Sequence, residues 1–178
     1  MTVLNNVLSG MLPRMSTARA LLGLYPTAAR RRACELIDRV GLTEEHIYRR
    51  ASKLSGGQQQ RVGIARAFIN YPAVVLADEP VASLDPNISH AILALLKDAS
   101  REQNSTVLCS LHQVDLARQF ADRIIGMRNG KIVFDGKPET LSDSALAAIY
   151  TGTVTEHFTQ RVCLSRAPLA ALSTADFS

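Results

Sequence analysis

Two carboxylates directly behind an apolar run are the first residues of this sequence that could do chemistry. The run is AVVLA, residues 73–77, and Asp78 and Glu79 follow it. Such a run is typical of a strand buried on both faces of a parallel sheet, and open α/β folds bind ligands at the carboxyl ends of these strands. An aspartate there can help to hold the Mg²⁺ that bridges nucleotide phosphates, and a glutamate can orient or deprotonate an attacking water. The plainer alternative is a polar strand end before a turn at Pro80.

A glycine turn is the second candidate site. The run Ser55-Gly56-Gly57-Gln58 opens a helical stretch to about residue 70, and Pro72 prevents its continuation. Backbone N–H groups at the start of a helix favour an anion such as phosphate. The Ser55 hydroxyl adds a donor, and the glycines allow a close approach of the backbone. The alternative is a plain helix N-terminus with a glycine hinge.

Two further polar positions accompany these motifs. The run Ser83-Leu84-Asp85-Pro86 has an N-cap residue before a proline, which indicates the start of a helix just beyond the two carboxylates. His112 follows the apolar run of residues 106–109, so it is expected at the same sheet edge, where it could hydrogen-bond a γ-phosphate. Taken singly, Asp85 could be only a cap, and His112 only a surface or core residue.

The elements that must position these side chains alternate between strands and helices. Strands are predicted at residues 73–77, 106–109, 123–128 and 131–134, and helices at 27–40, 56–70, from 86 onward, 113–121 and 141–150. Asn129-Gly130 is a strong signal for a hairpin between the last two strands, and Gly41 suits the end of the first helix. The order indicates an α/β fold with a helical portion in front of the sheet.

Composition and charge exclude several classes of protein. The 178 residues are 47% apolar and 20% charged, which is ordinary for one globular domain. No apolar run approaches the ~18 residues of a membrane span, and no signal peptide is expected at the N-terminus. Cys34, Cys109 and Cys163 form no CxxC pair, which indicates reduced thiols rather than disulfides or a zinc site.

Positive charge is concentrated in the first part of the chain. Residues 1–70 hold 11 Lys/Arg against 4 Asp/Glu, whereas the whole chain has a net charge of only +4. A basic surface could face nucleic acid or anionic lipid headgroups, or could simply solvate helix faces. No aromatic residues are interleaved with these arginines to stack on bases, so nucleic acid is not expected as a partner.

In their order along the chain, the four motifs resemble the ATPase domains of ABC transporters. The matching segments are LSGGQQQRVGIARA (residues 54–67), VVLADEPVASLDP (74–86) and SLHQVDLA (110–117). The resemblance covers residues 1–152 and implies a P-loop NTPase fold of the α/β class. It divides them into a helical subdomain with the signature motif, about 1–70, and the rear of a mainly parallel sheet core, 71–152. Residues 153–178 are treated as a C-terminal tail, for which disorder is one interpretation.

The resemblance also implies a role for each motif. In this family two domains close head to tail around two ATP molecules with Mg²⁺. Ser55, Gly56, Gly57 and Gln58 would be the signature that contacts ATP held by the partner domain. Asp78 would be the Mg²⁺ ligand, Glu79 the catalytic base and His112 the switch histidine near the γ-phosphate. Asp85 would belong to the loop that couples the two sites.

Within the family the sequence is most similar to the ATPases of phosphonate importers. Residues 5–26, 111–136 and 148–152 carry this similarity. It implies an enzyme that couples ATP hydrolysis to phosphonate uptake, peripheral on the cytoplasmic face of the inner membrane. The implied partners are a second ABC ATPase domain, in a homodimer, and an integral membrane permease. A periplasmic or extracellular binding protein would act indirectly.

One family motif does not occur in these 178 residues, the phosphate-binding loop G-x-x-x-x-G-K-[ST]. The nearest run, GMRNGK at residues 126–131, is one residue short and belongs to the predicted hairpin. In the family that loop precedes everything found here. We therefore expect the chain to be N-terminally truncated, with an uncovered sheet edge and an open core face. We also expect it to be inactive and prone to aggregate by itself.

Two other accounts of the sequence stay open at this point. The chain could be a non-catalytic remnant that offers only its signature motif, which the unfamiliar sequence after residue 152 favours. It could also be a soluble ABC ATPase of DNA repair or translation. Against that account stand the short spacing from signature to Asp78 and the absence of a coiled-coil insertion.

Overall fold

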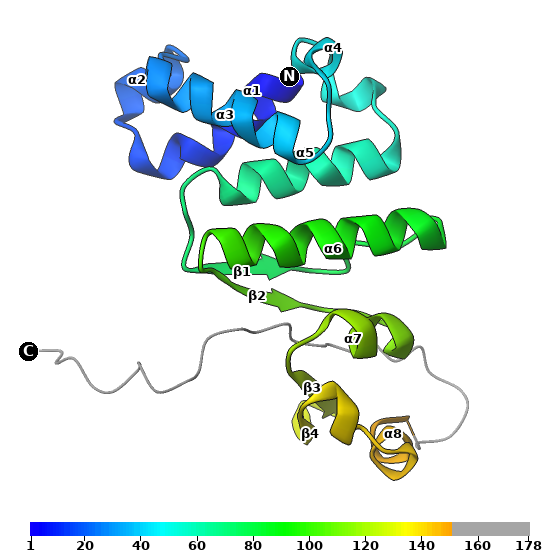
Figure 1. Cartoon of the computed structure of the whole chain (residues 1–178). Coiled ribbons are helices and arrows are strands. Elements are labelled where there is room, and N and C mark those ends of the chain that lie inside the picture. Colours follow the sequence, from blue (N-terminus) through cyan, green and yellow to red (C-terminus); the bar gives the residue numbers. More distant parts are fainter. Residues whose placement is uncertain (151–178) are drawn as a thin grey trace, which may run out of the picture.

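A long helix separates two layers of the structure. The computed structural model describes residues 1–150, so the expected tail over residues 153–178 lies outside the described residues. Helices of residues 3–68 lie on one side of α6 (Pro86–Glu102), and a sheet of β1 (Val74–Ala77) and β2 (Thr106–Cys109) lies on the other (Figure 1). A hairpin with two short helices completes the described chain. The predicted α/β fold is confirmed.

The helical layer is organised around three helices that pack on one another, α1, α3 and α5. Val7, Ile37 and Phe68, one from each helix, are at most 1% exposed. Burial of such a side chain stabilises the fold by about 1.5–3 kcal/mol. The elements of this layer are α1 (Val3–Leu8), η1 (Ser9–Arg14), α2 (Thr17–Leu21), α3 (Thr27–Arg39), α4 (Glu44–Ile47), η2 (Ala51–Lys53) and α5 (Gly56–Phe68).

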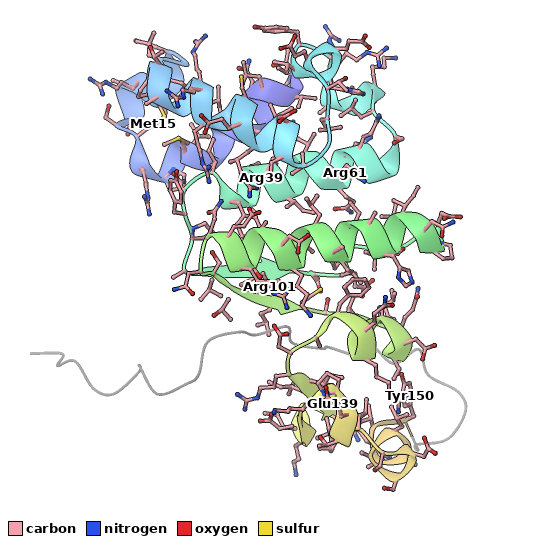
Figure 2. All side chains as sticks on the ribbon, viewed as in Figure 1. Met15, Arg39, Arg61, Arg101, Glu139 and Tyr150 are labelled. Carbon is pink, nitrogen blue, oxygen red and sulfur yellow. The ribbon has the colours of Figure 1, made fainter. Side chains whose placement is uncertain are left out.

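The end of α3 follows the sequence prediction. Gly41 has φ +73°, a left-handed conformation that glycine adopts without strain. Its N–H donates to the carbonyl of Asp38, and the N–H of Leu42 donates to that of Ile37, so the last turn ends in a Schellman motif. Arg61 on α5, whose side chain is labelled in Figure 2, donates from Nη1 to the Val40 carbonyl at 2.7 Å. The predicted helix end at Gly41 is confirmed.

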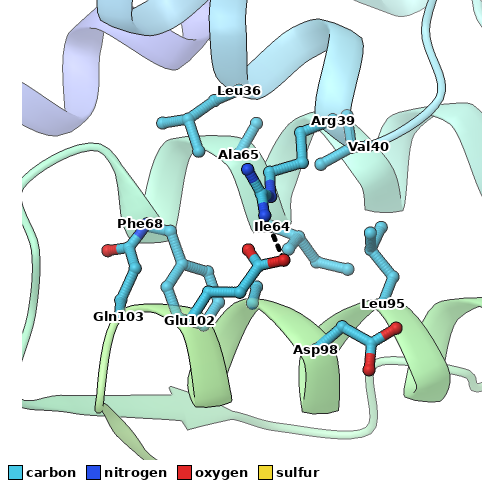
Figure 3. Close-up of a pocket in the computed structure, with 11 residues that line it drawn as sticks. Leu36, Arg39, Val40, Ile64, Ala65, Phe68, Leu95, Asp98, Glu102 and Gln103 are labelled. Carbon is cyan, nitrogen blue, oxygen red and sulfur yellow. Dashed lines mark ion pairs between the residues drawn. The ribbon is translucent and has the colours of Figure 1, made fainter.

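The helical layer meets α6 beside a cavity of about 140 Å³ (Figure 3). Arg39 on α3 and Glu102 on α6 form an ion pair there, and the hydrogen bond to Glu102 raises the pKa of the Arg39 guanidinium. Both side chains are about half exposed, so this pair contributes little to stability. Apolar residues around the cavity, among them Phe68 and Leu95, therefore carry the attachment of the two layers.

The strands β1 and β2 pair in parallel, with Ala77 opposite Cys109. The predicted burial of residues 73–77 on both faces is wrong for the described chain, because side chains alternate along a strand and α6 packs against one face. Val75 is 6% exposed, whereas Val74 and Leu76 are 57% and 74% exposed. Leu108 on β2 is also exposed. Among residues 1–150, the expected open core face is thus observed.

The remaining elements form an antiparallel hairpin flanked by helices, α7 (Val114–Phe120), β3 (Ile124–Arg128), β4 (Lys131–Gly136), η3 (Pro138–Thr140) and α8 (Asp143–Tyr150). Asn129 and Gly130 form the turn with φ +49° and +74°, which confirms the predicted hairpin. Ile149 on α8 is buried against Gly126 of β3. Within residues 1–150, no helix combines the length and apolar character that a bilayer span requires.

Candidate functional site

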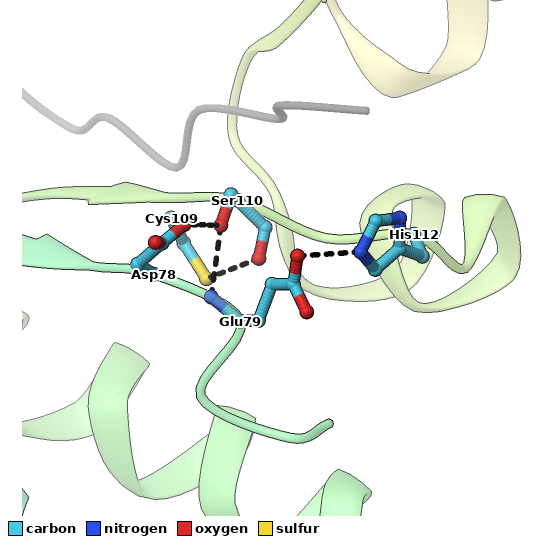
Figure 4. Close-up of polar contacts among 5 residues, drawn as sticks. All are labelled: Asp78, Glu79, Cys109, Ser110 and His112. Atoms are coloured by element: carbon cyan, nitrogen blue, oxygen red, sulfur yellow. Dashed lines mark hydrogen bonds and ion pairs between the residues drawn. The ribbon is translucent and has the colours of Figure 1, made fainter. Parts of the chain in front are cut away.

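The two predicted carboxylates lie at the carboxyl end of β1, beside the end of β2. The parallel register sets Ala77 opposite Cys109, so the next residues, Asp78 and Ser110, also become neighbours. The Ser110 hydroxyl donates to Asp78 Oδ1 at 2.6 Å and accepts the N–H of Glu79 at 2.8 Å (Figure 4). One serine therefore holds the side chain of one carboxylate residue and the backbone of the other.

The predicted histidine reaches the same edge of the sheet. His112 Nε2 lies 2.6 Å from Glu79 Oε1 (Figure 4). An ionised carboxylate can only accept, so in that state Nε2 donates this bond. The side chains of Glu79 and His112 are 35% and 44% exposed, which leaves both accessible from solvent. Residues Asp78, Glu79 and His112 thus meet as the sequence predicts.

Glu79 has an unusual backbone conformation with φ +46°. A left-handed conformation costs a residue other than glycine about 1 kcal/mol or more. The hydrogen bond from its N–H to Ser110 helps to fix this conformation. The sharp bend directs the chain away from the sheet after β1 and leaves the Glu79 carboxylate beside His112.

Asp78 has the chemistry of a magnesium ligand. Asp78 is exposed to solvent. The Ser110 hydroxyl is bonded to its Oδ1, so Oδ2 remains for a cation. Mg²⁺ prefers oxygen ligands and is usually held by one or two carboxylates together with phosphates and water. A single free carboxylate oxygen at this edge therefore fits an ion that is bound mainly through nucleotide phosphates.

The Ser55-Gly56-Gly57-Gln58 run begins α5, as predicted. The Gln58 N–H donates to Ser55 Oγ at 3.3 Å, and the Ser55 N–H donates to Gln58 Oε1 at 3.0 Å, which forms a capping box. The capping role uses Ser55 Oγ as an acceptor, so its hydroxyl hydrogen is left to donate. Among residues 1–150, the N–H groups of Gly56 and Gly57 have no acceptor. This end of α5 can therefore accommodate an anion.

The loop before α6 and the first turn of α6 both pack on these glycines. A Cβ built on Gly57 would lie 2.8 Å from Ile88 Cγ2, and one on Gly56 would lie 3.5 Å from Leu84 Cδ2. Asp85 Oδ1 accepts the N–H of Asn87 at 2.9 Å, which confirms the predicted cap of α6. The run of residues 55–58 thus lies beside the loop that contains Leu84 and Asp85.

Two residues of this region have roles that the motifs did not reveal. Ser110 lies between Asp78 and Glu79, and the parallel register of two predicted strands was the signal that could have found it. His46 Nε2 lies 3.1 Å from Gln58 Nε2 across a loop. No periodicity or motif in the sequence indicates that second contact.

Comparison with known proteins shows what the chain is similar to. Residues 1–82 match the family model described as ABC transporter. Over 150 residues the chain is 51% identical to the phosphonates import ATP-binding protein PhnC of Hydrogenovibrio crunogenus, covering 84% of this chain and 55% of the relative. The chain is thus similar to ATP-binding proteins of ABC transporters over the matched residues. It spans about half the length of the curated relatives it matches.

Solved structures of ABC proteins share this fold. An ABC transporter in an inward-facing conformation matches with a TM-score of 0.76 and 27% identity, over 93% of this chain and 67% of that one. A dimeric ATP-binding cassette in a post-hydrolysis state, bound to ADP and Pi, matches with a TM-score of 0.63 and 35% identity, over 78% and 57%. The ABC ATPase fold expected from the motifs is confirmed.

Proposed function

We propose that this chain provides the signature motif and the hydrolytic carboxylates of an importer ATPase for phosphonates. The observation that carries the proposal is the group of Asp78, Glu79 and His112 at the carboxyl ends of two parallel strands. The printed names of several relatives, phosphonates import ATP-binding protein, support the substrate class. Hydrolysis would drive uptake through a membrane permease.

In this proposal each residue at the sheet edge has one task. Asp78 would hold Mg²⁺ through Oδ2 while Ser110 fixes Oδ1. Bound Mg²⁺ would neutralise charge on the phosphates of ATP. Glu79 would orient the attacking water and accept its proton, since its carboxylate lies at the exposed edge. His112 would hold that carboxylate in place through Nε2 and lie near the γ-phosphate.

The signature run would act on a different ATP molecule, held by a second copy of the chain. The dimeric cassette with ADP and Pi supports a paired arrangement. Ser55 Oγ–H and the N–H groups of Gly56 and Gly57 are the donors for a phosphate group, and Gln58 fixes their geometry through the capping box. Asp85, in the loop beside these glycines, would couple the two sites.

The proposal places the chain in an assembly at a membrane. The second ATPase copy and a permease are the direct partners, and a periplasmic or extracellular binding protein acts through the permease. The chain would lie on the cytoplasmic face of the inner membrane. A nucleic-acid partner is not part of the proposal.

A fusion protein tests the activity. The segment of the Hydrogenovibrio relative that precedes its matched region would be joined in front of this chain. Its purpose is to supply the phosphate-binding loop that the resemblance to ABC ATPases implies. We expect the fusion to release phosphate from ATP with Mg²⁺, and Glu79→Gln to lower turnover by about 10²-fold or more. Glu45→Gln, an exposed carboxylate on α4, is the matched control and should keep full turnover.

The outcomes separate the proposed enzyme from a chain that only presents a signature motif. Turnover that depends on Glu79 supports the enzyme. A folded fusion without turnover, or turnover that Glu79→Gln leaves unchanged, contradicts it.

A further inference from the structure

Ser110 connects the two strand ends through a single hydroxyl group. It is 7% exposed, and its Oγ donates to Asp78 Oδ1 while accepting the N–H of Glu79. Its own N–H donates to the carbonyl of Ala77 at 2.9 Å, which extends the pairing of the strands by one step. The hydroxyl is thus held from both sides and leaves little freedom to either partner.

Each of the two bonds restricts a different group. The bond to Oδ1 fixes the rotation of the Asp78 carboxylate and so fixes the direction of Oδ2. The bond from the Glu79 N–H fixes the backbone of Glu79 at φ +46°. Without support, a glutamate would not keep this left-handed conformation. Loss of the hydroxyl would release both at once.

We propose that Ser110 is a positioning residue for hydrolysis, which orients the Mg²⁺ ligand Asp78 and the base Glu79 together. This inference rests on the proposed function and deepens it. Ser110 acts through its two neighbours, since its hydroxyl is already occupied by Asp78 and Glu79. Groups that orient a metal ligand typically change metal affinity or activity by about 10–100-fold when removed.

A second serine on the same strand pair provides a matched control. Ser105 precedes β2, is 3% exposed, and donates from Oγ to the carbonyl of Pro72 at 2.6 Å. It therefore bridges the same two chain segments at the opposite end of the sheet. Ser105→Ala removes a buried hydroxyl of the same kind without touching either carboxylate.

The first measurement needs no nucleotide. Amide hydrogen exchange of the chain, read at Glu79, should become about tenfold faster in Ser110→Ala, because one hydrogen bond is lost. Ser110→Thr, which keeps the hydroxyl, and Ser105→Ala should retain the original rate at Glu79. If the isolated chain does not stay in solution, the same peptide is read in the fusion protein.

The second measurement uses turnover of the fusion protein against Mg²⁺ concentration. Ser110→Ala should lower turnover by about 10–100-fold and raise the Mg²⁺ concentration for half-maximal rate, whereas Ser110→Thr restores both. Ser105→Ala should leave the Mg²⁺ dependence unchanged. A Ser110→Ala protein with the original exchange rate and Mg²⁺ dependence overturns the inference, provided that Glu79→Gln abolishes turnover. If Glu79→Gln has no effect, the proposed function itself has failed.

Discussion

Gly57 on α5 and Ile88 on α6 pack so closely that a Cβ on Gly57 would lie 2.8 Å from Ile88 Cγ2. Real Cβ atoms essentially never show that separation, so a larger residue at position 57 requires the Ile88 side chain to move. The contact joins the signature run to the first turn of the helix that Asp85 caps. The two elements proposed to act at the dimer interface are therefore fixed to each other within one chain.

Substitution of Gly57 should show this close packing directly. We expect Gly57→Ala to lower the free energy of unfolding by about 1–3 kcal/mol, the usual cost of overpacking. Gly63→Ala on the same helix is the control, since no atom lies within 4 Å of its Cβ. That variant should gain up to about 1 kcal/mol from helix propensity. Chemical denaturation measures both, and a Gly57→Ala protein as stable as Gly63→Ala would contradict the contact.

Asp85 allows a structural role to be separated from a functional one. Its Oδ1 caps α6, so Asp85→Ala should cost about 1 kcal/mol of stability. Asp85→Asn keeps an oxygen for the same bond and should leave stability nearly unchanged. If Asp85 also couples two sites, Asp85→Asn will still lower ATP turnover of the fusion. Full turnover in that variant limits Asp85 to capping.

The pair of Arg123 and Asp135 makes the free energy of unfolding depend on pH in the acid range. Arg123 donates two hydrogen bonds of 2.7 Å to the Asp135 carboxylate, and these hold its pKa below the ordinary value. The folded pKa is thus below the unfolded value of about 3.9. The pair therefore stabilises the fold above the unfolded pKa of Asp135, and this stabilisation is lost as the pH falls through the folded pKa. Arg123→Gln should raise the Asp135 midpoint in an NMR titration, and an unmoved midpoint would exclude the pair as its cause.

The open face of the sheet should govern solubility of the isolated chain. Val74, Leu76 and Leu108 are exposed on it, and contiguous exposed apolar side chains promote association. Leu76→Ser should increase the soluble fraction on sedimentation. Tyr48→Ser, at a site that is 77% exposed but lies in the helical layer, serves as the comparison. Equal effects of both substitutions would mean that the sheet face is not responsible.

Sequence patterns predicted the elements and the meeting of the carboxylates with the histidine. Helix periodicity, the Asp85-Pro86 start and the Asn129-Gly130 turn are local signals, and local signals fix where elements begin and end. The common sheet edge of Asp78, Glu79 and His112 follows from the direction of parallel strands.

Contacts between elements could not be predicted in the same way. The bridge through Ser110 depends on the strand register, because a shift of one residue would move its side chain to the other face. The contact of Gly57 with Ile88 depends on how two helices approach each other. The exposure of Val74 and Leu76 depends on what packs over the sheet, which an apolar run does not specify.

A mixing experiment tests the central claim that the signature and the carboxylates serve different ATP molecules. Two inactive fusion proteins are prepared, one with Ser55→Arg and the other with Glu79→Gln. A mixed dimer contains one intact site, formed by Glu79 of the first protein and Ser55 of the second. Equal amounts should therefore restore roughly a quarter of the original phosphate release, because half of the dimers are mixed and each has one working site. If the mixture stays as inactive as its components although mixed dimers form, both motifs serve the same site and the account is wrong.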